Sequence, residues 1–289
     1  MKNRLPVWFK QELPSRQARE FSGLLRDKFR LNTVCHSAKC PNATWCFSQR
    51  HATFLIMGNR CTRNCRFCNI EQEKNLLPSL DKDEPQRIAQ AVKFLNLQYV
   101  VVTSVTRDDL ADGGSGHFAK TIQAIKTLNP DISVEVLIPD FQGSNSALEI
   151  IIKQRPDVIA HNLETVKRIF PLVRHQADYK RSLDVLENIK LINSSQITKS
   201  SIMLGLGELD MDLEESLADL RLVKCDKLVL GQYLRPSPEQ YPVEKFYSPE
   251  EFKYWEKFAY GLGFKSVCAF PLARTSYLAN KNLAEKVLA

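Results

Sequence analysis

The feature of this sequence that most constrains its fold is a regular alternation of short apolar segments with segments of helical periodicity. From residue 51 onward, six apolar segments are rich in β-branched residues, and nearly every position in them is apolar. Parallel strands that are covered on both faces have this composition, whereas half-exposed strands alternate between apolar and polar residues. The sequence therefore predicts six buried parallel strands, at residues 52–57, 99–105, 133–138, 157–160, 200–204 and 227–230.

Segments with apolar residues at helical spacing lie between these strands and after the last one. A strand, a helix and a following parallel strand form a right-handed unit, and six such units fall short of the eight that close a full barrel. We therefore expect an α/β fold, a partial (β/α)6 barrel of the TIM type, with a doubly wound open sheet as the alternative. The expected helices are residues 84–95, 118–128, 146–154, 181–192, 213–222 and 249–260, and a strand-like run follows at 264–270.

A polar cluster follows each of the six predicted strands. Both fold alternatives place their chemistry at the carboxyl ends of the strands, so these clusters mark the expected active face. The pattern also divides the chain into an N-terminal extension at 1–50, the barrel at 51–262 and a C-terminal extension at 263–289. The polar clusters are residues 58–68, 106–114, 139–140, 161–164, 205–208 and 231–237.

The 289-residue chain has 44% hydrophobic and 25% charged residues, a balance that can bury a core without disulfide bonds. No apolar run is long enough to span a bilayer, and residues 1–9 lack the apolar core of a signal peptide. We therefore expect a cytoplasmic protein that is not bound to a membrane. The net charge is +7, but no helix-turn-helix or RNA-binding motif accompanies it, so we expect a basic surface and no nucleic-acid partner.

Clustered cysteines are the strongest chemical signal. Six of the eight cysteines fall within 34 residues. In a small secreted protein this density would indicate disulfides, but in a large chain without a signal peptide it indicates metal binding. The six are Cys35, Cys40, Cys46, Cys61, Cys65 and Cys68.

Cys61, Cys65 and Cys68 form a C-x3-C-x2-C pattern directly after the first predicted strand. Three thiolates on one tight loop suit a cube-shaped iron–sulfur cluster, and a cluster held by only three cysteines leaves one iron open to an external ligand. Structural zinc would require a fourth ligand at similar local spacing, which the sequence around this loop lacks. We therefore predict a [4Fe–4S] cluster with one exchangeable iron.

This loop, directly after a strand in a chain of six β/α units, resembles the radical S-adenosylmethionine superfamily. The resemblance implies that the open iron binds S-adenosylmethionine. It also implies that one electron cleaves this cosubstrate to methionine and a 5′-deoxyadenosyl radical, which abstracts hydrogen from unreactive carbon.

Cys35, Cys40 and Cys46 form a second trio, spaced C-x4-C-x5-C, which again lacks a fourth thiol nearby. The spacing indicates a second cluster with a distant fourth ligand. His36 is an alternative ligand, but its position next to Cys35 would make the opposite corner of a cube difficult to reach.

The two trios together resemble the lipoyl synthase family. That family pairs a C-x4-C-x5-C auxiliary cluster with the radical loop and ends in an Arg-Ser-Ser-Tyr motif. Residues 274–277 read Arg-Thr-Ser-Tyr, so the resemblance implies Ser276 as the fourth ligand of the auxiliary [4Fe–4S] cluster. An oxygen ligand matches iron less well in a sulfide cluster, so that iron should be the easiest to release. Further matching stretches are residues 102–114, 161–166, 203–208 and 231–237.

The resemblance implies a radical sulfurtransferase of lipoate biosynthesis. Such an enzyme inserts two sulfur atoms at C6 and C8 of an octanoyl-lysyl group on a lipoyl carrier protein or domain, and the auxiliary cluster is consumed as the sulfur source. The implied partners are this carrier, a reduced donor of the ferredoxin or flavodoxin type, and a protein that assembles or carries clusters. We expect a monomer, with Cys61, Cys65, Cys68 and Ser276 as catalytic residues.

Two alternatives remain open at the level of the sequence. The chain departs from the family pattern at His36, Ser37, Trp45, Phe47 and Thr275, and in the Gly-Asn-Arg at residues 58–60. These departures suggest, as one alternative, a divergent radical enzyme acting on another acyl chain or a small molecule. The alternative from another class is a non-catalytic metal-cluster regulator, which would release no methionine or 5′-deoxyadenosine.

Five further residues are candidate contacts for S-adenosylmethionine or substrate: Gly113, Gly114, Asn162, Glu164 and Glu208. The two glycines allow a ligand close to the backbone, although a plain turn also accounts for them. Asn162 and Glu164 are suited to hydrogen bonds with a ribose, with capping of a following helix as the alternative. Glu208 follows a Gly-x-Gly pattern, which is a weak signal that gains weight from its position after a strand.

Overall fold

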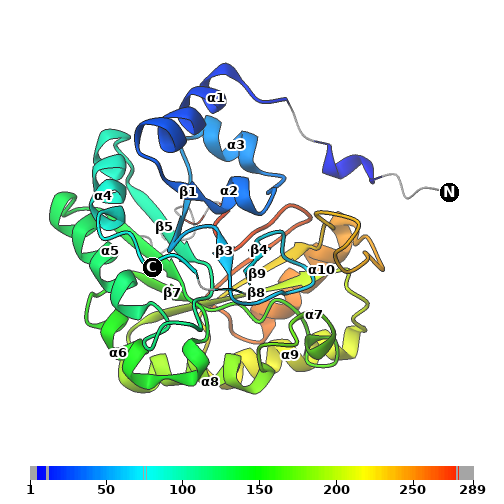
Figure 1. Ribbon diagram of the computed structural model, residues 1–289. Coiled ribbons are helices and arrows are strands. Elements are labelled where there is room, and N and C mark those ends of the chain that lie inside the picture. Colours follow the sequence, from blue (N-terminus) through cyan, green and yellow to red (C-terminus); the bar gives the residue numbers. More distant parts are fainter. Residues whose placement is uncertain (1–4, 11–12, 74, 76, 278, 280–289) are drawn as a thin grey trace.

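The computed structural model describes residues 5–10, 13–73, 75, 77–277 and 279 of the chain (Figure 1). An eight-stranded sheet lies at its centre, in the order β1-β2-β5-β6-β7-β8-β9-β10. Neighbouring strands from β2 to β10 are parallel, and β1 pairs antiparallel with β2. The strands are β1 (Asn32–Thr33), β2 (Thr53–Ile56), β5 (Tyr99–Ser104), β6 (Ser133–Leu137), β7 (Val158–Ala160), β8 (Ile197–Leu204), β9 (Lys227–Gln232) and β10 (Ser266–Ala269).

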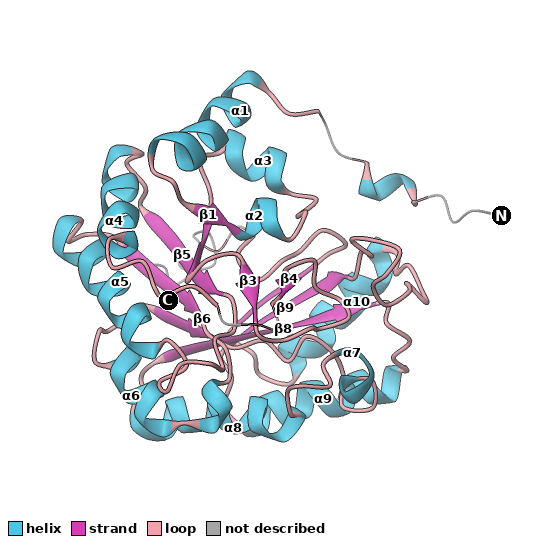
Figure 2. Cartoon of the chain, viewed as in Figure 1, coloured by secondary structure: helices cyan, strands magenta, loops and turns pink. Residues whose placement is uncertain are grey.

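Helices follow the strands and cover the outer face of the curved sheet (Figure 2). The sheet ends at β1 on one side and at β10 on the other, so it is open. The predicted series of six β/α units, from β2 to the helix after β9, is confirmed as a partial barrel, and β10 adds a seventh parallel strand. The helices that follow the strands are α4 (Glu84–Phe94), α5 (Ser115–Leu128), α6 (Asn145–Ile152), α7 (Phe170–Val173), α8 (Tyr179–Ile192), α9 (Asp210–Leu222) and α10 (Pro249–Gly261).

Local capping explains where several of these helices begin. The Ser144 hydroxyl accepts a hydrogen bond from Ala147 N at α6, and the Asp178 carboxylate accepts one from Arg181 N at α8. Ser248 and Glu251 form a reciprocal capping box at the start of α10. Each contact satisfies a backbone N–H that the first turn of a helix leaves without an intrahelical partner.

Two apolar clusters form the core between the sheet and its helices. One joins β2, β5 and β6 to α4, α5 and α6, and the other joins β8, β9 and β10 to α9 and α10. The strands are buried along nearly their whole length, as continuous apolar composition requires. No helix in the described part of the chain is long and apolar enough to cross a membrane.

The N-terminal residues lie against the β2 edge of the barrel. They form α1 (Arg16–Gly23), the π-helical turn η2 (Leu24–Lys28), α2 (Val34–Ser37) and α3 (Ala43–Ser48), after a short turn η1 (Val7–Phe9). Phe21, Leu25 and Phe47 are buried in the same cluster as β2. The division at residues 50 and 262 stays a prediction, and the segments before and after the barrel each contribute a strand, β1 and β10, to the main sheet.

Candidate active site

The radical loop, residues 58–69, follows β2 and contains one strand of a small two-stranded ribbon. In this ribbon β3 (Arg60–Cys61) pairs with β4 (Glu71–Gln72), and Glu73 N donates to Cys61 O at 2.9 Å. Backbone amides of Arg63 and Thr106 donate to Cys61 Sγ at 3.4 and 3.3 Å. Ile70 N donates to Cys68 Sγ at 3.4 Å. Such N–H donors stabilise thiolate charge, so the loop fits a cluster with cysteine ligands.

Arg63, between the first two cysteines of the radical loop, is directed inward and is 5% exposed. Its guanidinium forms forked hydrogen bonds to Asp108 at 2.7 and 2.8 Å and to Asp140 at 2.7 and 3.0 Å. Burial alone would raise the pKa of Asp140, but the hydrogen bonds and charge of Arg63 outweigh burial and hold this pKa well below its usual value. Arg181 Nε also donates to Asp140, at 2.9 Å. The radical loop is therefore tied to the ends of β5 and β6 by buried ion pairs.

The N-terminal trio consists of Cys35 in α2, Cys40 in the following turn and Cys46 in α3. Backbone hydrogen bonds hold this short segment in shape: Cys40 N donates to Cys35 O and Cys46 N donates to Asn42 O. Burial raises the pKa of the Cys35 thiol to about 12, with a smaller contribution from Cys40. Burial and the charges of the other two cysteines also raise the pKa of Cys46. The three thiols are close enough to interact electrostatically, as ligands of one cluster must be.

His36 is directed away from this trio. Its Nε2 is 2.9 Å from the Ser22 hydroxyl and its Nδ1 is 3.1 Å from the Thr33 hydroxyl. Because both ring nitrogens already have partners, His36 is not available as the fourth ligand in this arrangement.

The C-terminal strap, residues 270–277, runs from the end of β10 across the carboxyl ends of the strands. Gln232 N donates to Pro271 O, and Asn42 Nδ2 donates to Leu272 O at 2.6 Å across 230 residues of sequence. Gly231 lets the strap approach, because a Cβ at this position would lie 2.1 Å from Ala273 O. The strap thus links the end of β9 to the segment that carries the N-terminal trio.

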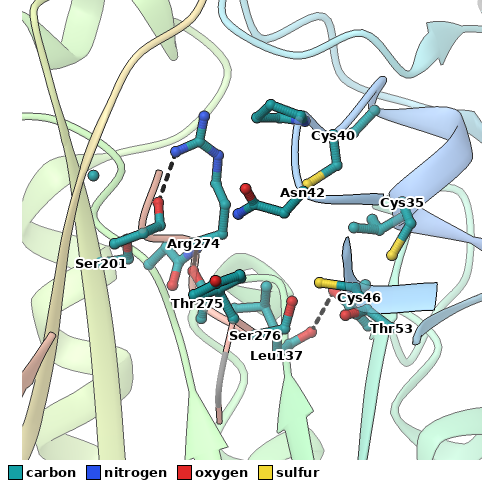
Figure 3. A pocket seen from close by; sticks show the side chains of 18 of the residues that line it. Cys35, Cys40, Asn42, Cys46, Thr53, Leu137, Ser201, Arg274, Thr275 and Ser276 are labelled. Atoms are coloured by element: carbon teal, nitrogen blue, oxygen red, sulfur yellow. Dashed lines mark hydrogen bonds between the residues drawn. The ribbon is translucent and has the colours of Figure 1, made fainter. Parts of the chain in front are cut away.

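Ser276 lies on this strap and lines the same cavity as the N-terminal trio. Figure 3 shows Cys35, Cys40 and Cys46 on one side of a cavity and Arg274, Thr275 and Ser276 on the other. The rings of Trp45 and Tyr277, the neighbours of Cys46 and Ser276 in sequence, have centroids 5.0 Å apart. The arrangement brings together the four side chains predicted to bind the auxiliary cluster.

The cavity has a volume of about 420 Å³ and extends from the cysteines into the barrel. The radical loop contributes Phe67, Cys68 and Asn69 to its wall, whereas Cys61 and Cys65 do not line it. Its other lining residues come from the N-terminal trio, the inner faces of β5, β6 and β8, the end of β9 and the C-terminal strap. The N-terminal trio and Cys68 of the radical loop therefore border a single cavity.

Asn162 and Glu164 lie at this cavity, at the end of β7. Asn162 Nδ2 donates to Glu164 Oε1 at 3.0 Å and to Thr275 Oγ1 at 2.9 Å. Asn162 Oδ1 is buried and has no hydrogen-bond partner among the described residues. Burial raises the pKa of Glu164, although Arg174 and Asn162 oppose this shift. These two side chains can accept hydrogen bonds from a hydroxyl-bearing ligand such as a ribose.

Three other predicted contacts lie elsewhere. Gly113 lines a second cavity of about 400 Å³, together with Asp108 and Thr106. Gly114 is packed so closely that a Cβ would lie 2.3 Å from Met57 Sδ. Glu208 accepts hydrogen bonds from Gly205 N and Leu206 N at 2.5 and 2.9 Å, and so closes its own loop. The structure does not bring these three residues to the cavity that the cysteines line, and their cofactor roles stay predictions.

The described residues contain no group of three His, Cys, Asp or Glu side chains arranged around one metal ion. A cube-shaped cluster does not require such convergence, because each thiolate binds a different iron. The donor set of six thiols in two trios, with amide donors at the sulfur atoms of the radical loop, fits two clusters.

Comparison with known proteins agrees with this geometry. A family profile described as the Radical SAM superfamily matches residues 55–220. The lipoyl synthase of Caldicellulosiruptor saccharolyticus is 49% identical over 97% of this chain and 98% of its own length. The lipoyl synthase of Aquifex aeolicus is 53% identical over 91% of this chain and 95% of its own length.

Solved structures support the fold. Methylornithine synthase (PylB) superposes with a TM-score of 0.54 at 13% identity, covering 75% of this chain and 70% of its own. HydG, a maturase of the [FeFe]-hydrogenase, gives a TM-score of 0.57 at 13% identity, covering 75% of this chain and 55% of its own. On the profile match and the full-length identity to its relatives, the chain belongs to the lipoyl synthase family of the radical S-adenosylmethionine superfamily.

Proposed function

We propose that this chain inserts sulfur at C6 and C8 of an octanoyl group carried on a lysine of a lipoyl carrier protein or domain. Membership of the family makes the chain a radical sulfurtransferase that uses S-adenosylmethionine and two [4Fe–4S] clusters. The observation that carries the proposal is the single cavity that the N-terminal trio, Ser276 and Cys68 of the radical loop border. An enzyme that abstracts hydrogen from a carbon and then adds sulfur to that same carbon needs both clusters next to one substrate chain.

Cys61, Cys65 and Cys68 would hold the cluster that binds S-adenosylmethionine. When bound, this cluster supplies the electron that cleaves the cosubstrate and starts hydrogen abstraction. The amide donors at Cys61 and Cys68 stabilise thiolate charge, and the ion pairs of Arg63 keep the radical loop in place. Asn162 and Glu164 would accept hydrogen bonds from the cosubstrate, since both line the cavity and Asn162 Oδ1 has no hydrogen-bond partner among the described residues.

Cys35, Cys40, Cys46 and Ser276 would hold the auxiliary cluster, the sulfur source. Three thiolates and one hydroxyl oxygen form an unequal ligand set, because oxygen is the harder donor. Ser276 also lies on a strap that is tied down at Asn42, Gln232 and Asn162. The strap contributes Ala273, Arg274, Thr275, Ser276 and Tyr277 to the wall of the cavity.

The partners follow from this reaction. The substrate is an octanoylated carrier, the reductant is a ferredoxin- or flavodoxin-type donor, and a cluster-carrying protein rebuilds the auxiliary centre after turnover. We propose that the protein is cytoplasmic, because free thiols and clusters require reducing surroundings. We also propose that it acts as a monomer.

Anaerobic reconstitution tests the assignment. Wild type should hold about eight irons per chain, and Cys46→Ala and Cys65→Ala about four each. Cys225→Ala, which changes a buried cysteine outside both trios, should keep all eight. With S-adenosylmethionine, reductant and an octanoyl-lysyl peptide, wild type should release 5′-deoxyadenosine and form lipoyl peptide.

The two trio variants separate the roles. Cys46→Ala should still release 5′-deoxyadenosine but form no lipoyl product, whereas Cys65→Ala should do neither. A wild type that holds eight irons and releases no 5′-deoxyadenosine would instead be a non-catalytic cluster protein, and the proposal would be wrong.

A further inference from the structure

The lower part of the cavity is an apolar channel inside the barrel. Its wall is formed by inward side chains of three strands: Val101 and Thr103 from β5, Leu137 from β6, and Ser201 and Met203 from β8. Tyr99, at the start of β5, is the lining residue nearest to the amino ends of these strands. At a rise of about 3.3 Å per residue, Tyr99 lies about 13 Å below Thr103 along β5.

Tyr99 is fixed through its hydroxyl by a buried ion pair whose carboxylate, Glu135, lies on the neighbouring strand β6 opposite Val101. Its hydroxyl donates to Glu135 Oε2 at 2.5 Å, and Lys199 Nζ donates to Glu135 Oε1 at 2.9 Å. Glu135 and Lys199 are 1% and 2% exposed and do not line the cavity. Neither side chain of the pair reaches the channel, and the pair anchors the ring of Tyr99 through its hydroxyl.

The N-terminal trio borders the channel just above this ring. In the sheet, Thr53 of β2 is paired with Val101, two residues along β5 from Tyr99. The Cys35 thiol lies against the backbone amide of Thr53, and Thr53 itself lines the cavity. A linear chain that ends on Tyr99 therefore has its last carbons at the level of this trio.

We propose that Tyr99 is the floor of an acyl channel and limits the bound chain to the length of an octanoyl group. This inference rests on the proposed function, because it takes an acylated lysine as the occupant. An apolar channel favours a longer chain with each methylene that it buries, until the terminal methyl meets the ring. A chain beyond that length bends or withdraws, and its last carbons leave the level of the trio.

Binding of acylated peptides to the reconstituted enzyme tests this. The probes are one short peptide whose lysine carries a hexanoyl, octanoyl, decanoyl or dodecanoyl group, with S-adenosylmethionine present and reductant omitted so that nothing turns over. Calorimetry gives Kd for each length. In wild type, Kd should fall about 15-fold from hexanoyl to octanoyl, since each buried methylene contributes about fourfold, and should fall no further at decanoyl.

Two variants should move the limit in opposite directions. Tyr99→Ala opens the floor, so decanoyl should bind at least about tenfold more tightly than octanoyl. Ser201→Leu narrows the channel from the opposite wall, one inward position above Lys199, so hexanoyl should become the best ligand. Tyr254→Ala, which removes a tyrosine exposed on α10, should keep the wild-type profile.

Iron content and thermal unfolding report whether each variant is intact. The inference is wrong if wild type gains the same 15-fold from octanoyl to decanoyl. It is also wrong if an intact Tyr99→Ala or Ser201→Leu keeps the wild-type limit. If the octanoylated peptide binds no better than the unacylated one, the proposed substrate class itself is wrong, which is a distinct result.

Discussion

The radical loop and the N-terminal trio both contribute to the wall of one cavity but are built differently. The radical loop follows β2 and is fastened to the ends of β5 and β6 by charged side chains, with Arg63 between Asp108 and Asp140. The N-terminal trio sits on two short helices at the β2 edge, and its predicted fourth ligand arrives on a strap from the other end of the chain. A centre that must persist is thus held by the barrel itself, whereas a centre that must be dismantled is held between two extensions.

Removal of Arg63, which anchors the radical loop, should cause the largest loss in the free energy of unfolding. Arg63→Ala leaves Asp140, which is 0% exposed, without its main partner, and should lower the free energy of unfolding by about 3 to 5 kcal/mol. Denaturant unfolding of the metal-free protein measures this. Arg60→Ala, on the same loop but half exposed, should cost less than about 1 kcal/mol. Equal losses would contradict the anchoring role.

Acid should weaken the barrel rim next. Burial, with a smaller effect of Arg174, lowers the pKa of His161 from 6.5 to about 4. His161 therefore takes up a proton near pH 6.5 in the unfolded chain but only near pH 4 in the folded chain. The contribution of His161 to the free energy of unfolding is complete above pH 6.5 and declines as the pH falls towards 4. The decline should reach about 3 kcal/mol in denaturant unfolding. It should be smaller in His161→Gln and unchanged in His175→Gln, which alters an exposed histidine. If His161→Gln lost as much stability on acidification as the wild type, the loss would come from titratable groups other than His161.

The strap offers a smaller but more selective perturbation. Gly231→Ala forces a Cβ against Ala273 O and should cost about 1 to 3 kcal/mol. Because the strap carries Ser276, this variant should lose auxiliary iron and fall from about eight irons per chain towards four, while still cleaving S-adenosylmethionine. Gly261→Ala is the control, since a Cβ there meets nothing within 4 Å. Loss of the radical cluster instead would show that the two regions are not independent.

The weakest expected effect is at the contact between the two extensions. Asn42→Ala removes the hydrogen bond to Leu272 O and should cost about 1 kcal/mol. The rate of iron loss to a chelator should rise for the auxiliary cluster and stay unchanged for the radical cluster. Equal rates in the variant and the wild type would mean that this contact does not hold the strap.

The sequence could predict the barrel because its signals are local. Continuous apolar strands and amphipathic helices each depend on neighbouring residues, so β2, β5 and β9 lie where periodicity indicates. The cysteine spacing identified both trios for the same reason. The link between Cys46 and Ser276 depended on a resemblance, because no local pattern joins residues so far apart in sequence.

Other parts of the site depend on packing that a sequence does not display. Arg63 reads as an ordinary basic loop residue until Asp108 and Asp140 are found beneath it. The backbone of Gly231 does not have a positive φ that would require glycine. Glycine is needed at this position because the strap passes too close to leave room for a Cβ. The carboxylate of Glu208 accepts hydrogen bonds from its own loop, which its position after a strand does not reveal, and its role as a ligand contact stays a prediction.

The most direct test of unequal centres is an iron count after one turnover. Holoenzyme with S-adenosylmethionine, reductant and octanoyl-lysyl peptide is allowed to form one lipoyl group, and the protein is separated from released iron. The account predicts a fall from about eight irons per chain to about four, with Cys61, Cys65 and Cys68 still holding a cluster that cleaves S-adenosylmethionine. Stoichiometric lipoyl product with all eight irons retained would contradict it.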